Sequence, residues 1–148
     1  MVLEGPYLVL GIDPGYSGCV VSLHRETGEV DGFIGLSETP HDVAEFVRAR
    51  ALSIDRAYLE KVHSMPRQGV ASTFKFGTSY GFCLGLLTSL LVPFEEVTPT
   101  KWQTFMKCKT GGDKNVTKAA AQRLHPRVKV THRNADALLI AEYGRRVG

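Results

Sequence analysis

The sequence has few of the features that mark secreted, membrane or disordered proteins. Its three cysteines (Cys19, Cys83 and Cys108) are an odd number at wide spacing, which favours reduced thiols over a disulfide or zinc framework. The first residues lack the succession of a basic segment, an apolar core and a small-residue cleavage site, so no secretory signal is expected. No tract is polar or repetitive enough to indicate disorder. These absences predict a cytoplasmic protein.

Long apolar runs are also scarce. The longest weakly charged stretch, 76–94, contains three glycines, a proline and several polar residues, which favours a buried core helix over a membrane span. With 148 residues, of which 43% are hydrophobic and 22% charged, the chain suits one compact domain covering 1–148.

Acidic residues are nearly missing between residues 101 and 133, where Asp113 is the single acid. A block of one charge inside a chain usually faces an anionic partner, and here nucleic acid is favoured over a merely solvated face. The nine basic residues of this block are Lys101, Lys107, Lys109, Lys114, Lys118, Arg123, Arg127, Lys129 and Arg133.

Apolar runs and turn residues predict a mixed α/β sheet flanked by helices. Glycine residues at every fourth position of the long helix (Gly77, Gly81 and Gly85) indicate close packing, against the sheet or against another helix. The expected strands cover 7–13, 19–24, 30–36, 56–60 and 93–99, with an extended segment at 126–130. The expected helices begin after Thr39, cover 69–91, begin after Thr98, and cover 116–124 and 132–146.

Three acids fall where a site could form. Asp13 ends the first strand inside "LVLGIDPGYSG", Glu60 ends the fourth strand, and Asp136 lies in the first turn of the last helix. If the first and fourth strands are neighbours, three carboxylates meet and repel one another, and such a cluster needs a divalent cation. His132, four residues before Asp136, is expected on the same helical face as a further ligand or a base. The glycine turn after Asp13 is by itself equally compatible with a phosphate cradle.

The segments "GIDPG", "YLEKV" and "ADALLIAEYGRR" resemble, in order and spacing, the RuvC-like Holliday junction resolvases, and in particular the short phage-type members. The resemblance implies a ribonuclease H-like fold whose mixed five-stranded sheet combines an antiparallel meander with parallel strands. It also implies that Asp13, Glu60 and Asp136 occupy three positions of the family's acidic tetrad. His132 stands where the fourth acid is expected, and its imidazole suits Mn²⁺ better than Mg²⁺.

The resemblance further implies an endonuclease that resolves four-way DNA junctions by paired hydrolysis, leaving 5′-phosphate and 3′-hydroxyl ends. Two Mg²⁺ or Mn²⁺ ions at each site would serve this chemistry, held by Asp13, Glu60, His132 and Asp136 as catalytic and metal-binding residues. A homodimer in the cytoplasm of a bacterial host, phage-encoded or nucleoid-associated, is expected, with no membrane and no nucleotide cofactor. The long helix is expected either at the dimer interface or buried within the monomer.

DNA contacts are expected from Lys101, Lys107, Lys109, Lys114 and Lys118, most of them in a mobile "KCKTGGDKN" loop or just after it. In the segment after Glu60, at the mouth of the site, His63, Met65 or Arg67 is a candidate to wedge or stack at the junction centre; the alternative is a solvated loop.

Two other readings stay open. A sugar-kinase or actin-like ATPase also begins with a strand, an aspartate and a glycine turn, but it needs two domains around its nucleotide. A non-catalytic protein of the same fold that binds branched DNA is favoured by His132 in place of an acid. The presence of all three other acids opposes that reading.

Overall fold

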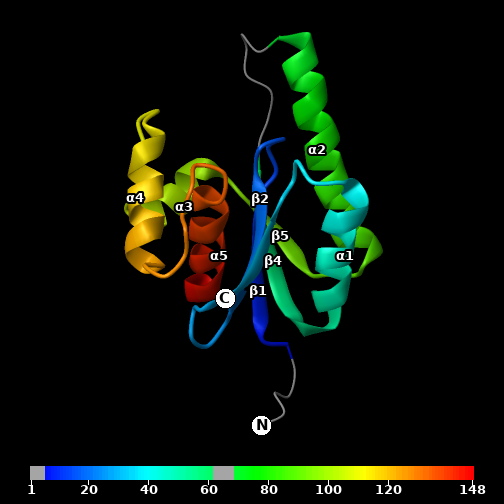
Figure 1. The fold of residues 1–148 in the computed structure, drawn as a ribbon, viewed down its shortest axis with the longest axis horizontal. Helices are drawn as coiled ribbons and strands as arrows, with labels where there is room; N and C mark the ends of the chain where they lie inside the picture. Colours follow the sequence, from blue (N-terminus) through cyan, green and yellow to red (C-terminus); the bar gives the residue numbers. More distant parts are fainter. Residues whose placement is uncertain (1–5, 62–68) are drawn as a thin grey trace.

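A computed structural model describes residues 6–61 and 69–148, which form a five-stranded mixed sheet between two layers of helices (Figure 1). The strand order is β3-β2-β1-β4-β5. The first three strands form an antiparallel meander, and β4 and β5 join it in parallel beside β1. The predicted fold is therefore confirmed. The strands are β1 (Leu8–Asp13), β2 (Cys19–His24), β3 (Val30–Gly35), β4 (Ile54–Glu60) and β5 (Phe94–Val97).

The helices divide between the two faces of the sheet (Figure 1). One face carries α1 (Pro40–Arg50) and α2 (Val70–Ser89), and a short 3₁₀ turn at Ala51–Ser53 leads from α1 into β4. The other face carries α3 (Pro99–Phe105), α4 (Lys114–Leu124) and α5 (Ala135–Val147). None of the helices in the described part of the chain has both the length and the apolar character that crossing a membrane requires.

Side-chain alternation along β1 separates two apolar cores. Val9 packs into the core beneath α3, α4 and α5, whereas Leu8, Leu10 and Ile12 pack into the core beneath α1 and α2. Because successive strand residues point to opposite faces, one apolar strand serves both layers.

Two helix starts were predicted from threonine–proline pairs, and both are confirmed. Thr39 Oγ1 accepts a hydrogen bond from the amide of Asp42 at 3.1 Å, and Pro40 is the first residue of α1. Thr98 Oγ1 accepts from the amide of Lys101 at 3.2 Å, and Pro99 is the first residue of α3. In each case the side chain satisfies an amide that the first helical turn leaves unpaired.

Helix α5 packs directly on the backbone of β1. A Cβ atom placed on Gly11 would overlap the carbonyl oxygen of Ala137 and the backbone of Ala141. Only glycine permits this approach, which fixes the start of α5 over the end of β1.

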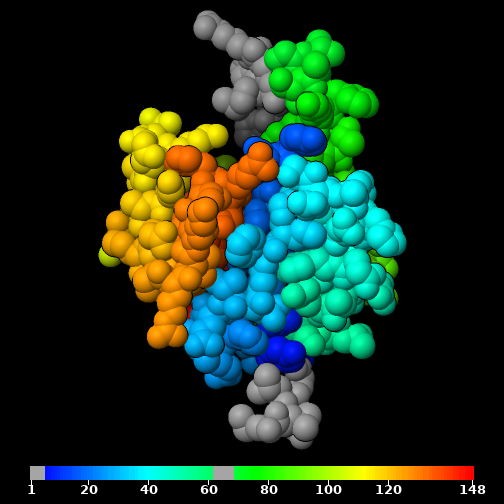
Figure 2. Space-filling view, viewed as in Figure 1, coloured from blue at the N-terminus to red at the C-terminus, as the bar shows by residue number. Residues whose placement is uncertain are grey.

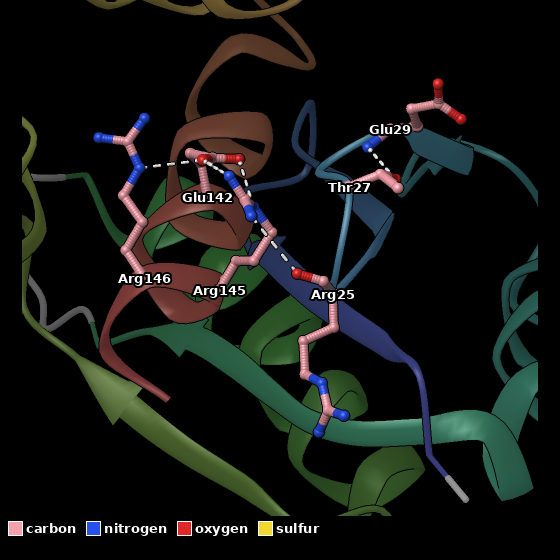
Figure 3. A network of polar contacts seen from close by, with 6 residues as sticks. All are labelled: Arg25, Thr27, Glu29, Glu142, Arg145 and Arg146. Atoms are coloured by element: carbon pink, nitrogen blue, oxygen red, sulfur yellow. Dashed lines mark hydrogen bonds and ion pairs between the residues drawn. The ribbon is translucent and has the colours of Figure 1, made fainter. Parts of the chain in front are cut away.

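The other end of α5 is held by a network of charges (Figure 3). Glu142, buried in the core, accepts hydrogen bonds from Arg145 Nη2 at 2.6 Å and from Arg146 Nε at 2.9 Å. Arg145 Nη1 also donates to the carbonyl of Arg25 at 3.4 Å, which ties the helix to the turn between β2 and β3. The helix is thus anchored at both ends.

Two expectations about elements are wrong. Residues 126–130 are not an extended segment. The chain turns at 126–128, where the amide of Val128 donates to the carbonyl of His125 at 3.1 Å, and the side-chain amides of Gln122 and Asn134 donate to the carbonyls of Val128 and Lys129. Helix α2 is not a buried core helix: only Cys83 and Leu87 are buried along its 20 residues, and it extends beyond the sheet (Figures 1 and 2).

Candidate active site

The three predicted acids lie at one end of the sheet. Strands β1 and β4 are paired in parallel up to Ile12 and Leu59, so Asp13 and Glu60, the next residue on each strand, end side by side. Asp136 is the second residue of α5, the helix that packs across β1. Two adjacent strands and one helix thus bring together acids that are far apart in the sequence, as predicted.

The glycine turn after β1 wraps around Asp13. The amide of Gly15 donates to Asp13 Oδ1 at 3.3 Å, and the amide of Gly18 donates to the carbonyl of Gly15 at 2.8 Å. A Cβ atom on Gly18 would overlap the Asp13 carbonyl oxygen and lie 3.0 Å from the Asp13 Cγ atom. The turn therefore serves the carboxylate itself, which favours a metal site over a phosphate cradle at this position.

Glu60 is buried, and a tryptophan holds it. Its side chain is 8% exposed, and its Oε2 atom accepts a hydrogen bond from Trp102 Nε1 at 2.7 Å. Trp102 lies on α3 and is itself fully buried. A buried carboxyl needs a hydrogen-bond partner, and this donor favours the charged form of Glu60.

Asp136 is surrounded by groups that favour its charged form. The hydroxyl of the buried Thr117 and the charges of Lys114 and His132 all lower its pKa. Thr117 and Lys114 both lie on α4, whose first turn is capped by Asp113. Burial outweighs these groups, so the pKa of Asp136 is still raised.

Burial and mutual repulsion raise the pKa values of the other two acids as well. Burial, followed by the charge of Asp136, raises the pKa of Asp13 to about 6. Burial, followed by the charge of Asp13, raises the pKa of Glu60 to about 8. Each carboxylate is therefore costly to ionise while its neighbours are charged, and a bound cation would offset that cost.

As the side chains stand, no group of three His, Cys, Asp or Glu residues within 6–61 and 69–148 lies close enough to hold one metal ion. The donor chemistry nevertheless fits a hard divalent cation, because the buried Glu60 and the partly buried Asp13 and Asp136 offer carboxylate oxygens whose charges repel one another. Nearby thiols do not compete, since burial raises the pKa of Cys19 and of Cys83 to about 12.

His132 is not on the face of the last helix, contrary to prediction. Helix α5 begins only at Ala135, and His132 is an exposed residue of the preceding turn. The Asn134 side chain closes this turn, because its Oδ1 atom accepts from the amide of Thr131 at 2.9 Å. His132 still lies near enough to lower the pKa of Asp136, and its role as ligand or base stays a prediction.

The predicted DNA-binding lysines lie on α3, on α4 and in the connection between them. Lys114 is the first residue of α4 and not part of the loop, because Asp113 Oδ1 caps the helix by accepting from the amide of Asn115 at 2.9 Å. The charge of Lys114 lowers the pKa of both Asp13 and Asp136, which places it beside the acids. Four of the lysines are exposed and Lys118 is partly buried; the five are Lys101, Lys107, Lys109, Lys114 and Lys118. His63, Met65 and Arg67 lie outside the described residues.

A groove lies between α2, the start of α1 and the turn that follows β1. Its volume is about 440 Å³, and Tyr16, Phe74 and Phe82 line it together with hydroxyl-bearing residues. Tyr16 is 56% exposed, and the Lys75 ammonium lies 4.8 Å from the centre of its ring. The turn after Asp13 therefore presents an aromatic ring, and α2 places a cation beside it.

Sequence reasoning missed two residues of this site and the position of a third. Trp102 donates to Glu60, Thr117 lowers the pKa of Asp136, and the charge of Lys114 on α4 lowers the pKa of Asp13 and Asp136. Trp102 is 42 residues from Glu60, so no local spacing connects the two. The one available signal was that the single tryptophan of the chain falls in a short helix directly after the β5 strand.

Comparison with known proteins places this geometry among solved folds. No family model and no curated protein sequence matches the chain. The structure of Thermus thermophilus RuvC in complex with Holliday junction substrate matches 95% of this chain and 96% of its own, with a TM-score of 0.63 and 17% identity. A further Thermus thermophilus RuvC structure matches the same shares with a TM-score of 0.61 and 18% identity. The chain therefore has the RuvC fold, the ribonuclease H-like arrangement that its three motifs predict.

Proposed function

We propose that this protein is a divalent-metal-dependent endonuclease that resolves four-way DNA junctions, with residues 1–148 forming one nuclease domain. The observation that carries the proposal is the cluster of Asp13, Glu60 and Asp136, which three separate elements bring to one end of a RuvC-like sheet. Placing three carboxylates at one end of the sheet opposes folding, since burial raises the pKa of each one and repulsion raises those of Asp13 and Glu60 further. A reaction that needs a bound cation explains why the chain would tolerate that unfavourable free energy.

Two Mg²⁺ or Mn²⁺ ions would be held by Asp13, Glu60 and Asp136, and His132 is a further candidate ligand. When bound, such ions activate water and stabilise the leaving 3′ oxygen of a phosphodiester. Asp13 is our candidate for a ligand that both ions would share, because it ends strand β1, which pairs with β4 and packs against α5. Lys114 would contribute positive charge next to the phosphate, since its charge lowers the pKa of Asp13 and of Asp136.

We propose that the lysines of α3, α4 and their connection contact DNA phosphates. Lys109 is exposed, and its charge is not among those that shift the pKa of Asp13 or of Asp136. It is therefore suited to a test of DNA binding alone. Lys109→Ala is expected to weaken junction binding and to reduce its salt dependence by about one ion. Nicking at saturating enzyme should be unchanged. Unaltered binding at several salt concentrations would remove Lys109 from the contact surface.

We further propose a homodimer, because resolving a junction needs two nicks in opposing strands. The exposed face of α2 supports this proposal. No atom of the described residues lies within 4 Å of a Cβ atom built on Gly77, Gly81 or Gly85. Val70 and Phe74, on the same face, are 89% and 75% exposed. A helix face of small and apolar residues is suited to close contact with a second copy.

The direct test is a labelled synthetic four-way junction incubated with the protein in Mg²⁺ and, separately, in Mn²⁺. We expect paired nicks in opposing strands of the junction and little cutting of a linear duplex of the same sequence. Asp13→Asn should abolish nicking and retain junction binding in a gel shift. Nicking by Asp13→Asn at the wild-type rate would exclude Asp13 from the reaction.

A second candidate is a non-catalytic protein that binds branched DNA. The observation in its favour is that no three metal-ligating side chains of the described chain are gathered as they stand, with His132 in a turn outside α5. The same assay separates the two candidates. A shift of the junction without nicks in either metal supports the binder, whereas paired nicks support the resolvase.

A further inference from the structure

Trp102 is the single tryptophan of the chain, and it is completely buried. Its indole N–H donates to Glu60 Oε2 at 2.7 Å. A buried indole N–H needs an acceptor, and a backbone carbonyl or a hydroxyl would satisfy it equally well. Here the acceptor is one of the three acids of the candidate active site, so the choice of partner requires a further explanation.

The backbone around this pair leaves little freedom. The amide of Lys61, the residue after Glu60, donates to the carbonyl of Val97 at 2.7 Å. Thr98 then caps α3, which carries Trp102 in its first turns. The end of β4 and the start of α3 are therefore joined by main-chain and capping bonds, and the indole is presented to the carboxylate at a fixed place.

We propose that Trp102 is a positioning residue: its indole N–H fixes the orientation of the Glu60 carboxylate for a divalent cation. The proposal rests on the nuclease function proposed above. It adds Trp102 as a residue that acts on the metal ion through Glu60. The bond engages Oε2 and does not involve Oε1, and a carboxylate has about four lone-pair sites in total. Glu60 can thus be held by α3 and still offer oxygen to a cation. Partners of this kind usually affect metal affinity by about 10- to 100-fold.

The single tryptophan makes the proposal testable without changing the residue. One indole ¹H–¹⁵N signal is expected in a nuclear magnetic resonance spectrum of the wild-type chain. Titration with Mg²⁺ alone should shift that signal, and Glu60→Gln should remove the shift while keeping an acceptor for the indole. Glu96→Gln, on the exposed part of β5, is the matched control and should retain the shift. A wild-type signal that does not move while calorimetry shows Mg²⁺ binding would overturn the proposal.

A second measurement uses Trp102→Phe, which keeps an aromatic ring and removes the donor. Electron paramagnetic resonance of Mn²⁺ should show about 10- to 100-fold weaker binding, and kcat on a junction should fall while KM is retained. Phe105→Leu, on the same helix, should bind Mn²⁺ as the wild type does. A folded Trp102→Phe protein with wild-type Mn²⁺ affinity would overturn the positioning role alone. A wild-type protein that neither binds Mn²⁺ nor nicks would overturn the proposed function as well.

Discussion

Helices α5 and α2 differ in how many of their residues are buried, and their amino-acid compositions do not predict this difference. In α5, nine of 13 residues are buried, although the helix contains Asp136, Glu142 and two arginines. In α2, two of 20 residues are buried, although Lys75 is its one charged residue. Apolar composition alone is therefore a poor guide to burial in this fold. The position of the helix relative to the sheet decides which side chains leave solvent.

Each helix departs from the arrangement that folding alone would favour. Helix α5 brings Asp136 near two other acids, and α2 leaves Val70 and Phe74 in solvent. Both departures have a cost, which partners outside the chain would offset. In the proposed function these are a cation for the acids and a second copy of the chain for the α2 face.

The largest effect is expected from a substitution that breaks the contact between α5 and the sheet. Gly11→Ala should destabilise the protein by about 3 kcal/mol or more, because the added Cβ atom meets the backbone of α5 and backbone cannot yield. Urea unfolding followed by circular dichroism measures this loss. A variant as stable as the wild type would contradict the close packing of α5 on β1.

The next effect concerns the acid that α5 uses for structure. Glu142→Gln should cost about 1–3 kcal/mol, because Arg145 and Arg146 lose their buried charged acceptor. These arginines lower the pKa of Glu142 below its ordinary value of 4.5, so its stabilisation is present above that pH and is lost as the pH falls further. The difference between the two proteins should therefore shrink in acid. Glu45→Gln, which removes an exposed pair with Arg48, is the control and should change little. An equally small change in Glu142→Gln at pH 7 would contradict the anchoring role.

The acids of the candidate site should give the opposite dependence of stability on pH. The pKa of Asp13 is raised from 3.8 to about 6 and that of Glu60 from 4.5 to about 8, so the folded state binds more protons than the unfolded state in between. Without metal, stability should consequently fall as the pH rises from about 4 to 8. Asp13→Asn should raise the metal-free stability at pH 8 by on the order of 1–3 kcal/mol, since one pKa unit corresponds to about 1.4 kcal/mol.

Unfolding in EDTA at pH 5 and pH 8 checks that prediction, and adding Mg²⁺ should stabilise the wild type more than Asp13→Asn at pH 8. A metal-free wild type that becomes more stable between pH 5 and pH 8, with Asp13→Asn less stable throughout, would show that the cluster is a structural feature.

The smallest expected effect tests the exposed face of α2. Gly81→Ala should raise the stability of the monomer by up to about 1 kcal/mol, because alanine favours a helix and no described atom obstructs its Cβ. The same change should weaken dimerisation if the glycine row is a contact surface. Sedimentation at several concentrations, together with urea unfolding, measures both effects. A stabilised variant with unchanged association would place the dimer contact elsewhere.

Much of the fold could be predicted because the local signals agreed with the final structure. Threonine–proline pairs marked the starts of α1 and α3, and apolar runs of strand length gave all five strands. The strand-end acids then followed from pairing β1 with β4. Residues 126–130 were misjudged because they bond to the nearby carbonyl of His125 and to the side-chain amides of Gln122 and Asn134, which periodicity does not reveal.

The site could be predicted only in part. The acids lie at element ends, which a sequence shows, whereas Trp102 and Thr117 reach them through tertiary packing, which it does not. His132 was assigned to a helix because its spacing to Asp136 is helical, but the Asn134 side chain closes a turn between the two. Spacing could not distinguish a helix from a turn that leads into one.

The most direct test of the account is to map the ends that the wild-type protein produces from a four-way junction in Mg²⁺ at pH 8. The account predicts symmetric nicks with 5′-phosphate and 3′-hydroxyl ends that DNA ligase reseals, and none with Asp13→Asn. Junction binding without nicks in both Mg²⁺ and Mn²⁺ would contradict it.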